Sequence, residues 1–135
     1  MERILLDTNA YTAFLAGDEK LLDAFARAGI VYMSVFVLGE LYAGFKGGSK
    51  EEENIRILRS FIQKPRVTVI NATERTSEIF GEIKDSLKRA GTPLPTNDVW
   101  IAAHAIETGS FLISYDGHFK KISGLQTWKV LASGA

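Results

Sequence analysis

The chain has 135 residues, a length that suits one compact domain, 1–135, built around a single hydrophobic core. Hydrophobic residues make up 46% and charged residues 24%, a globular rather than a disordered balance, and the lack of cysteine excludes disulfides, thiolate metal sites and cysteine nucleophiles. The 16 basic and 16 acidic residues give a formal net charge of zero, so a basic excess alone cannot supply binding to nucleic acid.

Strand-like and helix-like segments alternate along the chain. Short β-rich runs predict strands at residues 3–6, 30–33, 66–70, 110–114 and 127–131. Helices are predicted at 10–16, at 18–27, from Ser34 to 42, at 50–62, from a cap at Asn71 or Thr73 to 89, and from a cap at Thr96 to 108. This alternation favours a parallel sheet between helical layers, joined by right-handed crossovers.

The apolar stretches of the chain are short. The N-terminus reaches Asp7 after too short an apolar run for a signal peptide, and no stretch approaches the roughly 20 residues that cross a bilayer. Because cysteine is also absent, we expect a soluble, cytoplasmic protein without a membrane partner.

Two aspartates directly follow predicted strands. Asp7 ends the first strand, and Asp116 lies in the turn after the strand at 110–114. Ligands of open parallel sheets bind outside the carboxyl ends of the strands, so both carboxylates are expected at one edge of the sheet. Each aspartate alone is also a common turn former or helix cap. Two of them at the same edge favour a functional site.

Asp98 lies in the first turn of a predicted helix that is apolar for its next two turns. An acid at this place also complements the positive end of the helix, an interaction worth about 0.3–1 kcal/mol. Taken alone, Asp98 is explained by that interaction. The apolar helix is expected to be buried, which would turn its N-terminus toward the interior edge of the fold.

Glu40 lies on a helix that offers it no polar neighbour. The residues on the same face of that helix are Phe36, Val37, Ala43 and Gly44. A desolvated carboxylate without a partner is costly and tends to protonate. A cation beside Glu40 therefore explains its position better than the alternative, a surface glutamate at the rim of a packing face.

Four carboxylates at one site would repel one another and require compensating cations at neutral pH. Oxygen ligands, without Cys and without a helical His pair, favour Mg²⁺ or Mn²⁺ over Zn²⁺. His104 is expected to be a helix residue whose ring is satisfied locally. His118 follows Asp116 closely enough to approach the site, but a structural or surface role is favoured for a histidine in such a turn.

Four motifs of this sequence resemble the PIN domain, and most closely the VapC-type toxins of bacterial and archaeal toxin–antitoxin pairs. The motifs are Leu5-Leu6-Asp7-Thr8-Asn9, Gly39-Glu40-Leu41, Pro95-Thr96-Asn97-Asp98-Val99-Trp100-Ile101-Ala102 and Leu112-Ile113-Ser114-Tyr115-Asp116-Gly117-His118-Phe119. The segment from Phe119 to Leu125 is also similar to the family's segment after its last acid. The resemblance covers nearly the whole chain in motif order and spacing.

The resemblance implies a three-layer α/β/α sandwich around a central, mainly parallel five-stranded sheet. It also implies that the acidic metal cluster consists of Asp7, Glu40, Asp98 and Asp116. Asn9 and Ser114 match polar positions that support the site in the family, although a helix-start residue and a strand-end hydroxyl would explain them equally well. Ser114 stands where relatives often have Thr, which keeps the hydroxyl.

The expected activity is hydrolysis of RNA phosphodiester bonds by a water that one or two Mg²⁺ or Mn²⁺ ions activate. Asp7 and Asp98 would be direct ligands, Glu40 would bind metal or orient water, and Asp116 would hold a second or weaker ion. Lys120 and Lys121 are the best candidates for contacts to the RNA backbone. The expected protein partners are a second copy of the chain and an antitoxin that lays a peptide across the acidic groove.

Several alternatives remain at the level of sequence. A receiver-like phosphoacceptor or a haloacid-dehalogenase-like domain also places aspartates at strand ends, but the first would need an adjacent acid pair and the second an Asp-x-Asp motif. Here Asn9 occupies the third position of that motif. Within the favoured family, a nuclease of RNA processing outside toxin–antitoxin systems and a non-catalytic binding scaffold are the remaining alternatives.

Overall fold

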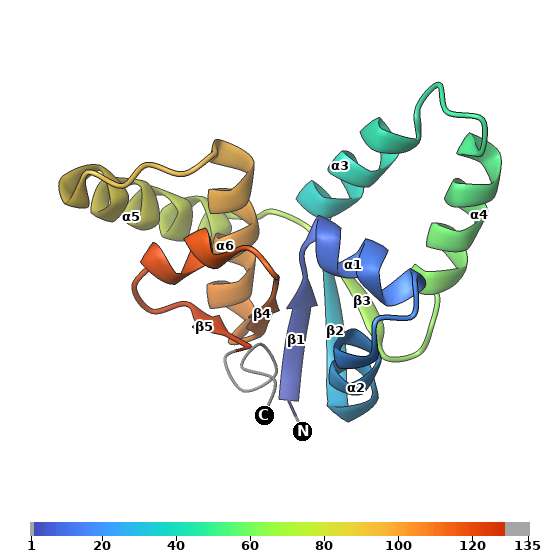
Figure 1. The fold of residues 1–135 in the computed structure, drawn as a ribbon. Helices are drawn as coiled ribbons and strands as arrows, with labels where there is room; N and C mark the ends of the chain where they lie inside the picture. Colours follow the sequence, from blue (N-terminus) through green and yellow to red (C-terminus); the bar gives the residue numbers. More distant parts are fainter. Residues whose placement is uncertain (1, 129–135) are drawn as a thin grey trace.

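A computed structural model describes residues 2–128, and its centre is a five-stranded sheet (Figure 1). The strands are β1 (Glu2–Leu6), β2 (Ala28–Ser34), β3 (Val67–Ile70), β4 (Phe111–Ile113) and β5 (Gln126–Thr127). Their order across the sheet is β3-β2-β1-β4-β5, and every neighbouring pair is parallel. The predicted five-stranded parallel sheet is therefore confirmed.

Helices cover both faces of this sheet. They are α1 (Thr8–Leu15), α2 (Glu19–Arg27), α3 (Val35–Phe45), α4 (Glu51–Ile62), α5 (Glu74–Ala90) and α6 (Thr96–Thr108), with a 3-10 helix η1 (Gly117–Lys121) before β5. In Figure 1, α5 and α6 lie on one side of β1 and the other four α-helices lie on the other. The three-layer α/β/α prediction is thus confirmed. Among residues 2–128, no helix is both long enough and apolar enough to cross a membrane.

The helix starts follow local capping chemistry. Side chains of Asp18, Ser34 and Thr73 accept backbone N–H groups at the starts of α2, α3 and α5. The predicted cap at Thr96 is wrong, because Pro95 holds the cap position without a side-chain hydrogen bond and Thr96 is already helical. The fifth strand is Gln126–Thr127 rather than 127–131, and residues 129–131 of that prediction lie outside the described part of the chain.

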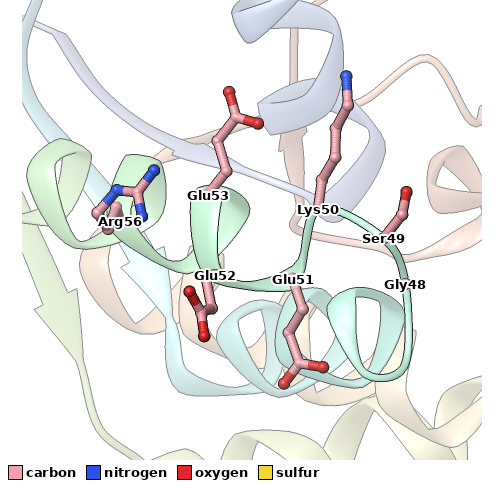
Figure 2. A pocket seen from close by; sticks show the side chains of 7 residues that line it. All are labelled: Gly48, Ser49, Lys50, Glu51, Glu52, Glu53 and Arg56. Atoms are coloured by element: carbon pink, nitrogen blue, oxygen red, sulfur yellow. The ribbon is translucent and has the colours of Figure 1, made fainter.

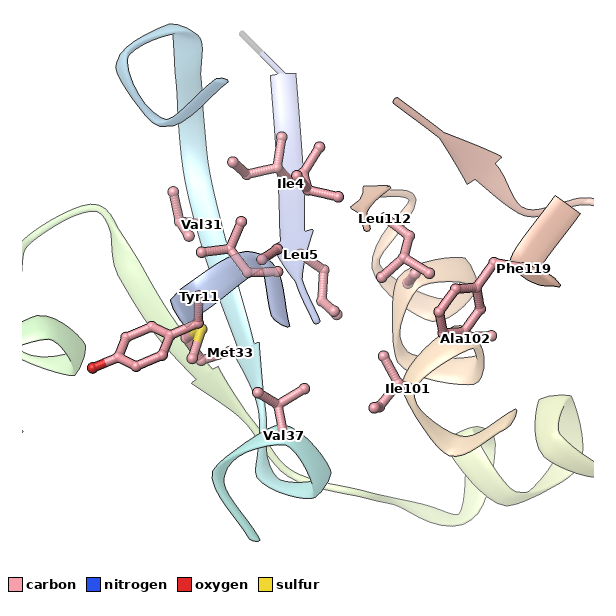
Figure 3. Packing of buried hydrophobic residues seen from close by; sticks show 14 of the residues in the cluster. Ile4, Leu5, Tyr11, Val31, Met33, Val37, Ile101, Ala102, Leu112 and Phe119 are labelled. Atoms are coloured by element: carbon pink, nitrogen blue, oxygen red, sulfur yellow. The ribbon is translucent and has the colours of Figure 1, made fainter. Parts of the chain in front are cut away.

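The core lies around β1, which pairs with β2 on one side and β4 on the other. Figure 3 shows part of this core, to which β1, β2, β4 and α6 all contribute apolar side chains. In α6 every residue from Ile101 to Ala105 is buried, which confirms the expectation of a deeply packed helix. This packing holds the first turn of α6 close to the sheet, and that turn carries Asp98.

The strand order changes direction beside β1. The chain moves from β1 outward to β2 and β3, and then crosses back to place β4 on the other side of β1. Connections leave β1 and β4 in opposite directions, and ligands of open α/β sheets commonly bind at the carboxyl ends of the strands at such a reversal. Asp7 follows β1 at this point, where its backbone N–H donates to the carbonyl of Ile113 at 3.2 Å.

Candidate functional site

The four predicted carboxylates gather beside the carboxyl end of β1. Asp7 follows β1, Asp116 lies in the turn after β4, Asp98 is in the first turn of α6, and Glu40 is in α3. Asp98 and Asp116 both help to raise the pKa of Asp7, and Glu40 and Asp116 both help to raise that of Asp98. Each of the four carboxylates therefore lies close enough to another for their charges to interact.

Asp7 is the most buried of the four, with 7% of its surface exposed. Its Oδ1 accepts the backbone N–H of Ala10 at 2.8 Å and so caps α1. Burial is the main cause that raises the pKa of Asp7, and the neighbouring carboxylates of Asp98 and Asp116 add to it. Hydrogen bonds from Ser114 and Ala10 act in the opposite direction without cancelling the rise.

One histidine ring joins Asp98 to Asp116. The Nε2 of His118 lies 3.0 Å from Oδ2 of Asp98, and its Nδ1 lies 2.6 Å from Oδ1 of Asp116. The backbone N–H of His118 also donates to Oδ1 of Asp116, at 3.0 Å. Burial raises the pKa of Asp98, and the contact with His118 opposes that rise.

His118 was favoured as a structural or surface residue from the sequence, and the structure places it in the site instead. Its position two residues after Asp116, at the start of a short helix, was the available signal. That signal was too weak because the direction of the ring depends on η1, which the sequence pattern did not predict. Asp116 caps η1 and thereby turns the ring of His118 toward α6.

Glu40 is exposed, which corrects the expectation of a desolvated carboxylate. The buried residues of α3 are Val37 and Leu41, so Glu40 lies beside the packed stripe rather than in it. The apolar residues around it include Gly39 and Ala43, which are too small to cover it and are exposed themselves. Its partner is the hydroxyl of Thr8, which donates to Oε1 of Glu40. Thr8 was not predicted from the sequence to be part of the site.

The two predicted supporting residues differ in their surroundings. Ser114 is half-buried between the acids: its Oγ accepts the backbone N–H of Asp116 at 3.0 Å, and its side chain also hydrogen-bonds to Asp7. Asn9 is exposed on α1, and no hydrogen bond of its side chain occurs within residues 2–128. Lys120 and Lys121 are exposed on η1, one turn beyond Asp116.

His104 is fully buried and lies in α6, away from the acids. The expectation of local partners is wrong, because its ring contacts residues from two other segments. Nδ1 lies 2.8 Å from Oγ of Ser34, and Nε2 lies 3.2 Å from the carbonyl oxygen of Asn71. A carbonyl only accepts, so Nε2 carries the proton and the Ser34 hydroxyl donates to Nδ1. Burial lowers the pKa of His104 and favours this neutral form.

A surface hollow at the corner between α3 and α4 is separate from this site. Figure 2 shows its lining, which consists of Gly48, Ser49, Lys50, Glu51, Glu52, Glu53 and Arg56. None of the four carboxylates at the sheet edge contributes to it. Its glutamates lie in the first turn of α4, where they complement the helix N-terminus.

The donor groups at the sheet edge fit a hard divalent cation. The ion pairs within residues 2–128 include no Lys or Arg beside any of the four carboxylates, and His118 is the basic group that contacts two of them. Carboxylate oxygens are the ligands that Mg²⁺ and Mn²⁺ prefer. No three Asp, Glu or His side chains of the described chain stand ready to hold one ion, so binding would require side-chain rotation.

Comparison with known proteins places these features in a family context. The family model described as PIN domain matches residues 4–125. The chain is 30% identical to Ribonuclease VapC2 of Haemophilus influenzae over 130 residues, which cover 94% of this chain and 97% of that relative.

Two solved structures share the fold over nearly the same span. One is a DNA-bound VapBC from Salmonella typhimurium, with a TM-score of 0.83 and 26% identity over 94% of this chain and 97% of the other. The second is VapBC2 from Rickettsia felis bound to a DNA fragment from their promoter, with a TM-score of 0.81 and 27% identity over 93% of this chain and 96% of the other.

Proposed function

This chain belongs to the PIN-domain family, and on that premise we propose that it is a metal-dependent endoribonuclease, the VapC-type toxin of a toxin–antitoxin pair. The observation that carries the proposal is the gathering of Asp7, Asp98 and Asp116 at one sheet edge without a Lys or Arg partner in the described chain. The similarity to a ribonuclease along almost the whole chain supports RNA as the substrate.

Asp7 and Asp98 would be the direct ligands of Mg²⁺ or Mn²⁺. Bound metal supplies Lewis acidity, which polarises a phosphate oxygen and makes a water molecule more acidic. The cap bond to Ala10 fixes Oδ1 of Asp7 and thereby the place of its carboxylate. Asp98 is held by the first turn of the deeply packed α6, so neither ligand depends on a mobile loop.

The exposed carboxylates take the roles that need contact with water. Glu40 would bind metal or orient the attacking water, because its Oε1 is held by Thr8 while the side chain stays exposed. Asp116 would hold a second or weaker ion. Its backbone is fixed by the hydroxyl of Ser114, which we propose as a supporting residue together with Asn9.

RNA must be bound without a basic excess, because the chain has a formal net charge of zero. Phosphate would be attracted partly by the cations at the acidic edge and partly by Lys120 and Lys121, which are exposed on η1 next to Asp116. The acidic cluster thus has two tasks, since its cations would attract the phosphate as well as promote its hydrolysis.

We also propose two protein partners. Both similar structures are VapBC proteins bound to DNA, which supports an antitoxin partner for this chain. The second partner is another copy of the chain. Phe36 of α3, Trp100 of α6 and Phe80 of α5 stack at 5.1 and 3.9 Å between ring centres, yet all three rings stay partly exposed. A homodimer would cover this aromatic row.

An RNA cleavage assay tests the enzymatic proposal. Purified protein should cut a labelled single-stranded RNA with Mg²⁺ or Mn²⁺ and stop when EDTA is added. Asp98→Asn should lose this activity, whereas the matched variant Asp85→Asn should keep it, because Asp85 lies on α5 in a surface pair with Arg89. Metal-independent cleavage, or full activity of Asp98→Asn, would reject the proposal.

A further inference from the structure

We propose that Trp128 is a positioning residue for the acidic edge, acting through the backbone of Ser114. The proposal rests on the proposed nuclease function, because it concerns the turn that carries Asp116. Trp128 itself is buried, with 4% of its surface exposed, so it would not touch RNA directly. Its effect would reach the site through one hydrogen bond to the turn.

Trp128 contacts the turn after β4 in two ways. Its indole Nε1–H donates to the carbonyl of Ser114 at 2.6 Å, and its ring meets the ring of Tyr115 edge to face at 5.0 Å between centres. The hydroxyl of Tyr115 in turn donates to Oδ2 of Asp18 at 2.8 Å. The turn is therefore held from both sides, by Trp128 and by the residue that caps α2.

Trp128 supplies a hydrogen bond to the turn just beyond the pairing of β4 with β5. In the part of the chain that the structure describes, β4 has three residues and β5 has two, and the last pair between them is Leu112 with Thr127. Among residues 2–128, no backbone N–H donates to the carbonyl of Ser114. The side chain of Trp128, the residue after β5, provides that donor instead.

A fixed Ser114 peptide holds two groups of the site in place, the hydroxyl of Ser114 and the carboxylate of Asp116. The Ser114 hydroxyl accepts the backbone N–H of Asp116 and hydrogen-bonds to Asp7. Asp116 in turn contacts His118, which reaches Asp98. Without the indole N–H, the Ser114 carbonyl would lose its partner in a part-buried place, and the turn would relax toward solvent. Asp116 would then be the first acid to be displaced.

Trp128→Phe tests the proposal, because it keeps an aromatic ring against Tyr115 and removes the donor. Mn²⁺ binding is measured by calorimetry on the full chain without RNA, and kcat and KM are measured on a labelled RNA. We expect Mn²⁺ binding to weaken roughly fivefold, the factor that corresponds to one lost hydrogen bond, and kcat to fall similarly while KM stays within about twofold. Gln126→Ala, on the exposed side of β5, should behave as wild type.

Unchanged Mn²⁺ affinity and kcat in a Trp128→Phe protein that merely melts earlier would overturn the proposal and leave Trp128 a packing residue. If Trp128→Phe fails to fold, benzothienylalanine at position 128 replaces it, since this ring has the shape of indole without the N–H, and the same criteria apply. A wild-type chain that neither binds Mn²⁺ nor cuts RNA would instead reject the proposed function. If the wild-type chain is active and the variants at position 128 are unaffected, only the role of Trp128 is rejected.

Discussion

Asp7 serves the fold and the site with one carboxylate. Its Oδ1 caps α1, and its burial beside two other acids raises its pKa. A residue chosen for stability alone would be neutral at this place, since an uncompensated buried charge is costly. Functional sites commonly retain such groups at the expense of stability.

Asp7→Asn should abolish RNA cleavage and raise the melting temperature at pH 7. Asparagine keeps the capping oxygen and removes the buried charge. Because the folded-state pKa of Asp7 is raised, the protonated carboxyl favours folding at low pH, and this contribution is lost as the pH rises through the folded-state pKa. The stability gain of the variant should therefore shrink as the pH falls toward 3.8, the ordinary value for the group.

Thermal unfolding at pH 7 and near pH 4, together with the cleavage assay, checks both parts. Loss of an outer-shell partner of a metal commonly costs 10–100-fold, so loss of a direct ligand should cost more than about 100-fold in activity. Asp23→Asn is the control, because Asp23 pairs with Arg27 at the surface of α2. A variant that is less stable than wild type at pH 7 would contradict the burial argument.

His118→Ala should destabilise the protein when divalent ions are absent. The ring is the basic group that contacts both Asp98 and Asp116, and its removal leaves two acids facing each other. The contact is partly exposed, so the free energy of unfolding should fall by no more than about 1 kcal/mol. Added Mg²⁺ should reduce this deficit. Urea unfolding with and without Mg²⁺ measures it, with Lys120→Ala as the control, and a deficit that Mg²⁺ does not change would argue against the prediction.

At the scale of helices and strands, local chemistry was predictable and side-chain direction was not. The starts of α2, α3 and α5 follow from Asp18, Ser34 and Thr73, because a cap depends on two or three consecutive residues. The places of Asp7 and Asp116 follow from strand ends in the same way. Each of these predictions uses information contained in one short segment.

Apart from the cap predicted at Thr96, the errors in the site concern contacts between segments. Glu40 was expected to be buried because the sequence shows which residues share its helix face but not how far the neighbouring elements cover that face. His104 and His118 find their partners on other elements, so their roles required the tertiary structure. The contact of Trp128 with Ser114 likewise joins two segments that lie apart in the sequence.

His104 makes the connection between α6 and α3 sensitive to pH. Its pKa is lowered by burial, so below about 6.5 the unfolded chain takes up a proton that the folded chain does not. This contribution to stability is present above pH 6.5 and is lost as the pH falls. The nearby carboxylate of Glu107 acts against the shift without reversing it.

His104→Gln should remove that pH dependence. The free energy of unfolding of wild type, minus that of the variant, should decrease as the pH falls from 7.5 to 5. Asp7 and Asp98 have raised pKa values and change stability in the opposite sense, but they do so in both proteins. Their contributions therefore cancel when the two free energies are subtracted, and the contribution of His104 remains. Denaturant titrations at four or five pH values provide the measurement, and two parallel curves would refute the prediction.

For the whole molecule, the strand order explains why the site has contributions from both halves of the chain. The first half, through β1 and α3, supplies Asp7 and Glu40, and the second, through α6 and the turn after β4, supplies Asp98 and Asp116. The halves meet where β4 returns to β1. The family match also removes the receiver-like and dehalogenase-like alternatives that strand-end aspartates had left open.

A homodimer is the prediction at this scale. The chain mass is 14.9 kDa, so light scattering at micromolar concentration should give about twice that value. Phe36→Glu would place a charge on the partly exposed aromatic row and should shift the mass to that of a monomer. Leu22→Glu is the matched control, because Leu22 is exposed on α2. A monomeric mass for the wild-type chain would contradict the dimer.

The central claim is that the acids beside β1 bind the catalytic cation, and the anomalous signal of Mn²⁺ in crystals of the wild-type chain tests it most directly. We predict a peak in contact with Asp7 and Asp98, near Asp116, that disappears in crystals of Asp7→Asn. The glutamates that line the α3–α4 hollow are the internal comparison, since they are acidic but lie away from the sheet edge (Figure 2). A peak at that hollow and none beside β1 would contradict the account.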